Sequence, residues 1–182
     1  MDKHIIRNWS KSDIPALAKY LNNKKIWDNC RDSLPCPYTE ENAARFIEST
    51  KCQNGQHNYC VKVNGEAAGN ISFIRGTDVE RYNAELGYWL AECYWNRGIM
   101  TAVLRHTIDD YFLNTDAIRI YANVYANNPA SMKVLEKNGF RKCGIHEKAC
   151  FKNGEFIDCH YFELLKCGGG MRPCKVNFKV CN

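Results

Sequence analysis

The sequence predicts a mixed α/β (α+β) domain, and three observations lead to this fold class. Asn-Gly pairs at residues 64–65 and 153–154 each separate two strand-like runs, and Asn-Gly is the strongest short-range signal for a β-hairpin. An amphipathic run that begins near residue 99 has the 3.6-residue period of a long helix. The other segments alternate between strand and helix patterns, giving the order β-α-α-β-β-β-α-β-α-β-β without an internal repeat.

The N-terminal half contains the first six of these elements. They are a strand at 4–9, a helix at about 12–22, a helix that starts at 39–40, hairpin strands at 57–63 and 67–74, and, after a polar loop at 76–83, a strand at 84–90. Thr39 suits the N-cap of the second helix because its side chain can accept a hydrogen bond from the first turn. Residues 23–38 are expected to be irregular, because Pro35 and Pro37 break regular elements.

The C-terminal half contains the other five elements. They are a helix from residue 99, a strand at 117–125, a helix from 128 to 138, and hairpin strands at 140–151 and 156–165. Pro129 fits a first helical turn, where its missing N–H costs little. The helix from residue 99 has one apolar face, formed by Met100, Val103, Leu104, Thr107, Ile108, Tyr111 and Phe112.

Length and composition bound the possible functions. The 182 residues predict one domain at 1–166, followed at 167–182 by a flexible tail that starts with a glycine run. The net charge of +5 is modest and spread along the chain, so nucleic-acid binding, which needs clustered Lys and Arg, is not expected. No apolar run approaches the roughly 20 residues that span a bilayer, so no membrane partner is expected and a cytoplasmic location is the default.

The eleven cysteines show no Cys-x-x-Cys spacing, so the sequence predicts no metal site. In a cytoplasmic protein, free and mostly buried thiols are expected. Cys167, Cys174 and Cys181 recur every seven residues in the tail, where a role in metal or disulfide binding is disfavoured.

The most informative segment is the loop before the long helix. It consists of Trp95, Asn96, Arg97, Gly98, Ile99, Met100 and Thr101. A loop that leads from a strand into a helix presents unpaired backbone N–H groups at the positive end of the helix dipole. The sequence therefore predicts a site for a phosphate-bearing ligand at this loop.

Four short motifs, in this order and on these elements, resemble the GNAT superfamily of acetyl-CoA-dependent N-acetyltransferases. They are ELGY at 85–88, WNRGIMT at 95–101, NPAS at 128–131 and LEKNGF at 135–140. Within that superfamily the chain looks like the branch that contains bacterial ribosomal-protein N-terminal acetyltransferases, over residues 4–166. The resemblance implies a largely antiparallel seven-stranded sheet with a splayed central strand pair, and four helices.

The resemblance also implies where acetyl-CoA binds. The loop at 95–101 would bind its pyrophosphate through backbone amides, and Gly98 allows close approach because it has no Cβ. Two residues depart from the family pattern: Trp95 replaces Gln or Arg, and Met100 replaces a small residue, so that it either narrows the pocket or turns inward. Leu90 would place a backbone N–H at the thioester carbonyl. Asn128 would contact the cofactor arm, cap a helix, or do both.

Two catalytic candidates follow from the same resemblance. Glu85 lies on the strand where relatives place a carboxylate beside the amine, so it is a candidate general base; the alternative is a surface glutamate in an ion pair. Ser131 is the candidate proton donor to the departing thiolate, since Leu135 occupies the position at which many relatives have a tyrosine. Ser131 could instead bond only locally in its helical turn.

The implied reaction is direct transfer of an acetyl group from acetyl-CoA to a primary amine, which is either a protein N-terminal α-amine or a small molecule. Residues 27–41 and 76–83 would wall the acceptor site. The acids at 28, 32, 40 and 41 either attract a cationic amine or are solvated charges. The alternative function is a non-catalytic acetyl-CoA-binding regulatory module, motivated by Trp95, Met100 and the missing tyrosine. The sequence sets no oligomeric state.

Overall fold

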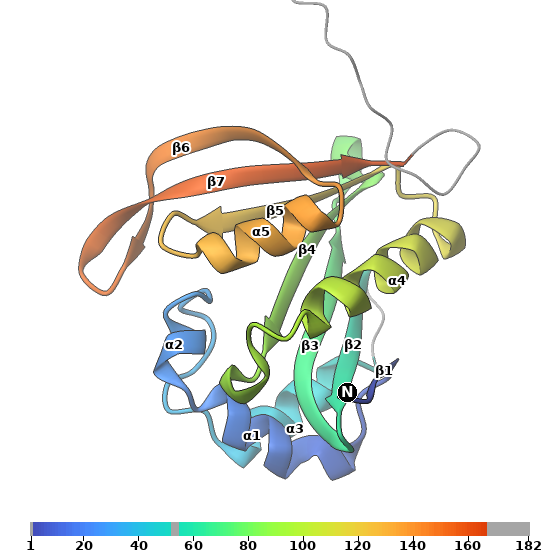
Figure 1. Ribbon diagram of the computed structural model, residues 1–182, viewed down its shortest axis with the longest axis vertical. Coiled ribbons are helices and arrows are strands. Elements are labelled where there is room, and N and C mark those ends of the chain that lie inside the picture. The colour runs from blue at the N-terminus through green and yellow to red at the C-terminus, as the bar shows by residue number, and fades with distance from the viewer. Residues whose placement is uncertain (1, 52–54, 167–182) are drawn as a thin grey trace, which may run out of the picture.

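The computed structural model describes residues 2–51 and 55–166 (Figure 1). The predicted tail at 167–182, with Cys167, Cys174 and Cys181, lies outside the described residues. The strands are β1 His4–Arg7, β2 Gln56–Val63, β3 Glu66–Arg75, β4 Asn83–Leu90, β5 Arg119–Tyr125, β6 Arg141–Lys152 and β7 Glu155–Leu165. The α-helices are α1 Ile14–Leu21, α2 Lys24–Trp27, α3 Glu40–Ser49, α4 Ile99–Asn114 and α5 Pro129–Lys137, and short 3-10 turns lie at Lys11–Asp13, Asp78–Glu80 and Glu92–Tyr94.

The seven strands form one sheet in the order β1-β2-β3-β4-β5-β7-β6. All neighbours are antiparallel except β4 and β5, which are parallel. The pairing between β4 and β5 extends only from Asn83–Arg119 to Glu85–Tyr121, although β4 continues to Leu90. Beyond that register the two strands diverge, as Figure 1 shows. The predicted seven-stranded sheet with a splayed central pair is confirmed.

The structure has five α-helices in its described part, one more than the four expected. The additional helix, α2, lies in the segment predicted to be irregular. Asn23 caps it, because its side-chain oxygen accepts hydrogen bonds from the N–H of Lys25 at 2.9 Å and of Ile26 at 3.3 Å. A helix of one turn is too short to show a 3.6-residue period, and burial of Ile26 is a tertiary effect.

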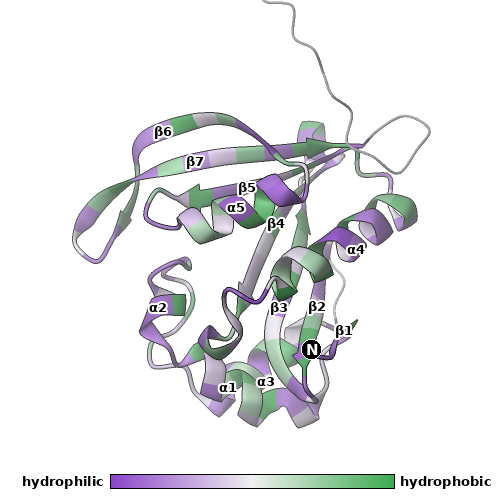
Figure 2. Ribbon diagram, viewed as in Figure 1, coloured by the Kyte–Doolittle hydropathy of each residue, from purple (hydrophilic) through white to green (hydrophobic). Residues whose placement is uncertain are grey.

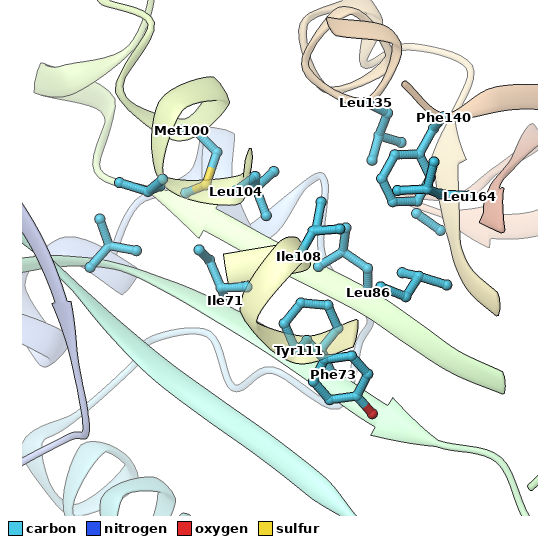
Figure 3. Packing of buried hydrophobic residues seen from close by; sticks show 14 of the residues in the cluster. Ile71, Phe73, Leu86, Met100, Leu104, Ile108, Tyr111, Leu135, Phe140 and Leu164 are labelled. Atoms are coloured by element: carbon cyan, nitrogen blue, oxygen red, sulfur yellow. The ribbon is translucent and has the colours of Figure 1, made fainter. Parts of the chain in front are cut away.

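The helices cover both faces of the sheet and enclose two apolar clusters. On one face, the predicted apolar stripe of α4 packs against β3, β4 and β5, and α5 covers the same face (Figure 3). The ring of Tyr111 stacks on that of Phe73, with centroids 4.1 Å apart. On the other face, α1 and α3 enclose a second cluster around Leu17 and Ile47. These helices carry both hydrophobic and hydrophilic residues in Figure 2, as expected for elements with one buried side.

The cysteines correct one expectation. All seven cysteines within the described ranges are free, but only Cys60 and Cys159 are buried. Cys36, Cys93 and Cys143 are exposed, because they lie in an irregular segment, a short 3-10 turn and the edge strand β6. No helix in the described ranges is long and apolar enough to cross a bilayer.

Candidate functional site

The divergence of β4 from β5 exposes backbone groups of β4. The N–H of Ala91 donates to the carbonyl of Ala68 at 2.7 Å, on the β3 side. Because backbone groups alternate in direction along a strand, the N–H and carbonyl of Leu90 point the opposite way, toward the space where β5 has left the ladder. We call this space the wedge, bounded by Tyr88–Leu90 of β4 and 122–125 of β5. The carbonyl of Leu90 accepts a hydrogen bond from the Trp95 indole at 2.7 Å.

The loop after β4 turns sharply into α4. Asn96 has a φ of 59° and Gly98 a φ of 74°, a left-handed conformation that glycine adopts at little cost. The N–H of Ala102 bonds to the Gly98 carbonyl at 3.1 Å, and no side chain caps the helix. The N–H groups of residues 99–101 therefore stand at the positive helix end. A Cβ built on Gly98 would meet no protein atom within 4 Å, so this side of the loop is open.

The side chains of the loop separate into two groups. Ile99 and Met100 are buried, and Met100 packs in the α4 cluster (Figure 3). Of the two possibilities for Met100, the structure shows the inward one. Trp95 and Arg97 lie at the surface, and Arg97 stacks over the ring of Tyr94, 5.5 Å from its centroid.

The first turn of α5 brings Asn128 and Ser131 together. The Asn128 side-chain oxygen accepts a hydrogen bond from the Ser131 N–H at 3.1 Å, so Asn128 is an N-cap. The Ser131 hydroxyl lies 2.7 Å from the hydroxyl of Tyr88. Sequence reasoning missed Tyr88, although it lies two residues before Leu90 on the same side of the strand. Burial raises the pKa of Tyr88, which keeps its phenol protonated.

Glu85 lies on the opposite face of β4. It occupies the last register at which β4 pairs with β5, at the vertex of the wedge. Its carboxylate forms an ion pair with Arg31, from the segment after α2. The ion-pair alternative for Glu85 is therefore observed, and the role of a base stays a prediction. Glu85 and Ser131 approach the wedge from opposite faces of the sheet, because Trp89 packs on the α1–α3 side and Tyr88 on the α4–α5 side.

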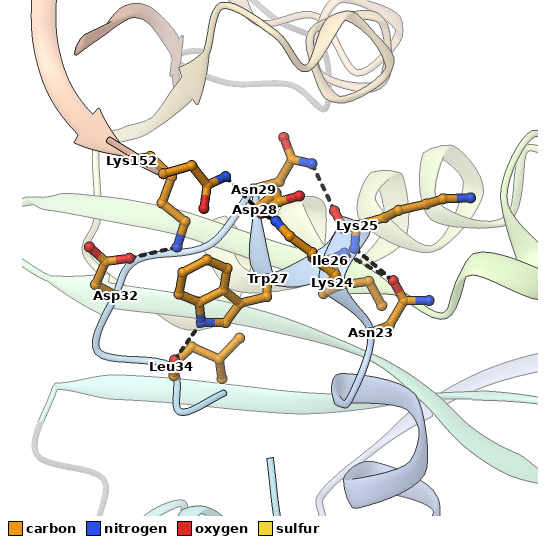
Figure 4. Close-up of polar contacts among 11 residues, drawn as sticks. Asn23, Lys24, Lys25, Ile26, Trp27, Asp28, Asn29, Asp32, Leu34 and Lys152 are labelled. Atoms are coloured by element: carbon orange, nitrogen blue, oxygen red, sulfur yellow. Dashed lines mark hydrogen bonds and ion pairs between the residues drawn. The ribbon is translucent and has the colours of Figure 1, made fainter. Parts of the chain in front are cut away.

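The segment 27–34 is fixed to the turn between β6 and β7, as Figure 4 shows. The Lys152 ammonium lies 2.6 Å from the Asp32 carboxylate, and only 2% of the Lys152 side chain is exposed. Asp28 bonds to Lys24 at 2.5 Å and to the Asn153 amide at 2.8 Å. These two acids therefore hold the wall of the predicted acceptor site together, whereas the exposed acids at 40 and 41 lie in the first turn of α3.

Comparisons with known proteins agree with this architecture. A family model described as an acetyltransferase (GNAT) domain matches residues 3–141. An uncharacterized N-acetyltransferase, p20 of Bacillus licheniformis, is 29% identical over 170 residues, which cover 88% of this chain and 92% of that protein. The L-amino acid N-acetyltransferase AaaT of Escherichia coli is 24% identical over 169 residues, covering 91% of this chain and 100% of AaaT.

One solved structure shows the same fold with coenzyme A bound. The ribosomal L7/L12 alpha-N-protein acetyltransferase RimL, in complex with coenzyme A, superposes with a TM-score of 0.78. It is 22% identical, and the match covers 89% of this chain and 93% of RimL. At that identity the likeness shows the fold.

Proposed function

Because the chain belongs to the GNAT family of acetyltransferases, we propose that it transfers the acetyl group of acetyl-CoA directly to a primary amine in a ternary complex. Acetyl-CoA-dependent N-acetyl transfer is the activity of the family, and acetyl-CoA is its co-substrate. The observation that carries the proposal is the wedge. The N–H of Leu90 points into it, and the Ser131 hydroxyl meets β4 at Tyr88 on one face of the sheet. The Glu85 carboxylate lies on the other face, where β4 and β5 begin to diverge.

The proposed cofactor site uses backbone groups on two elements. The N–H groups of the loop at 96–98 and of the first turn at 99–101 would hold the pyrophosphate, since the first turn is the positive end of α4 and Gly98 leaves the approach open. The indole of Trp95 supports this arrangement by fixing the carbonyl of Leu90. While its oxygen caps α5, the amide nitrogen of Asn128 would contact the cofactor arm.

In the proposed reaction, the amine attacks the thioester carbonyl, and the N–H of Leu90 stabilises the oxyanion that forms. Glu85, five residues before Leu90 on β4, accepts through a relay of water the proton that the amine loses. When the C–S bond breaks, its electron pair stays on sulfur, and the Ser131 hydroxyl donates the proton that turns the thiolate into a thiol. The transfer is direct, so no acetyl group is attached to the protein at any stage.

Two classes of acceptor fit a primary-amine reaction at this site. One relative is named as acting on L-amino acids and one structural neighbour as acting on a protein α-amine. We propose that the acceptor enters on the face of Glu85, between Arg31 and the wedge. A carboxylate there attracts an ammonium group, as either class of acceptor presents.

Bisubstrate kinetics test the proposed order of events. Initial velocities measured at several fixed amine concentrations should give intersecting double-reciprocal lines, because both substrates bind before chemistry. Intact mass of the protein after incubation with acetyl-CoA alone should not change. Parallel lines together with an acetylated protein would show a covalent intermediate and would overturn direct transfer.

A further inference from the structure

A tyrosine from β4 meets the proposed proton donor of α5. The Tyr88 hydroxyl lies 2.7 Å from the Ser131 hydroxyl oxygen and 3.1 Å from the Ser131 backbone carbonyl. Tyr88 therefore reaches from β4, in the part of the strand that no longer pairs with β5, to the first turn of α5. The contact joins β4, on one side of the wedge, to α5, the helix that follows β5.

The position that supplies a tyrosine in many relatives cannot supply a hydroxyl here. Leu135 occupies it, and its side chain is fully buried in the apolar cluster under α5. Within the part of the chain that the structure describes, the Ser131 hydroxyl forms its side-chain hydrogen bond with Tyr88. A phenol is thus present beside the donor, but it comes from a strand.

We propose that Tyr88 is a positioning residue, which orients the Ser131 hydroxyl so that its hydrogen is free for the departing thiolate. This inference rests on the proposed function. Each hydroxyl has one hydrogen. Tyr88 donates its hydrogen to the Ser131 hydroxyl oxygen, which is the shorter of its two contacts. The hydroxyl hydrogen of Ser131 is then not used in bonding to Tyr88 and can point into the wedge.

The proton balance gives Tyr88 a second effect. As the C–S bond breaks, Ser131 gives its proton to sulfur, and negative charge develops on the Ser131 oxygen. The Tyr88 hydrogen bond stabilises that charge without transferring its own proton. Glu85 then releases the proton that it took from the amine to solvent, and a proton from solvent restores the Ser131 hydroxyl. Because burial raises the pKa of Tyr88, the phenol stays in the donating form throughout.

The test compares Tyr88→Phe, Ser131→Ala and the double variant by steady-state kinetics. We expect Ser131→Ala to lower kcat about 100-fold, as loss of a general acid does. Tyr88→Phe should lower kcat about 10-fold, the effect of one lost hydrogen bond. The KM for acetyl-CoA should not change in either. In the Ser131→Ala background, Tyr88→Phe should have no further effect, because two residues that act as a unit are not additive.

Several outcomes would overturn the proposal. If the two effects multiply in the double variant, Tyr88 acts independently of Ser131 and the inference is wrong. If Ser131→Ala lowers kcat and Tyr88→Phe does not, the positioning role fails while the proposed function stands. Full activity of Ser131→Ala would instead remove the proton donor from the proposed function itself.

Two controls distinguish an effect on the chemical step from an effect on folding. Rates are normalised to coenzyme A binding sites counted by titration, so that an unfolded fraction of a variant does not enter kcat. Tyr59→Phe is the matched control, since Tyr59 lies on β2 and loses only a hydroxyl. Its kcat should equal that of the parent protein. A Tyr59→Phe loss as large as that of Tyr88→Phe would show that the effect is structural.

Discussion

The ammonium of Lys152 lies 3.2 Å from the centroid of the Trp27 ring and 2.6 Å from the Asp32 carboxylate. A cation held on an aromatic face and paired with an acid connects the end of β6 to the end of α2 and the segment after it. The Trp27 indole is itself fixed by a hydrogen bond to the Leu34 carbonyl at 2.9 Å. Arg31, which forms an ion pair with Glu85, lies between Trp27 and Asp32 in the sequence, so the Lys152 contact restricts the backbone on both sides of it.

Replacing Lys152 with methionine should loosen the wall of the acceptor site. Methionine matches the apolar part of the buried lysine chain but loses the cation, and a desolvated cation–π contact contributes about 2 kcal/mol. We expect a lower melting temperature and a KM for the amine raised roughly 5- to 10-fold, with the KM for acetyl-CoA unchanged. Thermal melts and steady-state kinetics measure both. Lys19→Met, at an exposed and weakly paired lysine, is the control and should change neither quantity.

Alanine at Gly98 should weaken cofactor binding. The φ of 74° costs an L-residue about 1 kcal/mol, and the new Cβ would project into the open side of the loop. We expect the Kd for acetyl-CoA to rise about 10-fold, measured by calorimetry, because a methyl group would keep a phosphate from the backbone.

Gly154 supplies a matched control for that variant. It lies in the β6–β7 turn with a φ of 83°, and an added Cβ there also meets no atom within 4 Å. Gly154→Ala should therefore lose similar stability and keep the parent affinity for acetyl-CoA. Equal affinities in the two variants would contradict the proposed pyrophosphate site.

The role of Glu85 can be separated from that of its ion pair. Glu85→Gln removes the proton acceptor, whereas Arg31→Met removes only the partner. If Glu85 is the base, Glu85→Gln should lower kcat about 100-fold and Arg31→Met less than about 10-fold. Equal losses in both variants would reduce Glu85 to a structural role. Glu92→Gln, which breaks a surface pair with Lys25, should leave kcat unchanged.

Lowering the pH should remove the stabilisation that the Asp13 carboxylate gives the folded protein. Burial alone would raise the pKa of Asp13, but hydrogen bonds from the Arg7 guanidinium and the Ser10 N–H outweigh it and lower that pKa. Because this pKa is lower in the folded than in the unfolded protein, the charged Asp13 stabilises the fold at pH values above the unfolded pKa, which is near 3.9. The contribution is lost as the pH falls through the folded pKa.

The corresponding variant is Asp13→Asn. Because the Asp13 side chain is only 7% exposed, we expect it to lower the free energy of unfolding by roughly 3 kcal/mol at pH 7. In urea titrations this difference from the parent protein should shrink below about pH 4. A difference that is constant from pH 7 to pH 3 would contradict the account. Glu48→Gln, at an exposed pair with Lys51, should have no measurable effect.

The elements that the sequence predicted best are those whose signals are local. The 3.6-residue period of α4 continues for four turns, and an Asn-Gly pair fixes each hairpin without help from distant residues. Helix α2 escaped prediction because a single turn carries no period. Its formation depends on the Asn23 cap and on burial of Ile26 against distant residues.

The candidate site also combines local features, which the sequence predicts, with long-range contacts, which it does not. The backbone turn at Gly98 and the cap at Asn128 follow from residues a few positions apart. The contacts that complete the site join Tyr88 to Ser131 across 43 positions and Lys152 to Asp32 across 120. No spacing in the sequence predicts such pairs, because only the folded sheet brings them together.

Release of free thiol from acetyl-CoA in the presence of amines tests the central claim most directly. The parent protein is incubated with acetyl-CoA together with one class of amine at a time: amino acids, a polyamine, or peptides with free N-termini. Free thiol and acetylated product are quantified in each reaction. We predict amine-dependent thiol release with one molecule of acetylated amine per thiol, and at least one acceptor class well above the rest. Tight binding of acetyl-CoA without thiol release from any amine would contradict the account and would indicate a non-catalytic binding module.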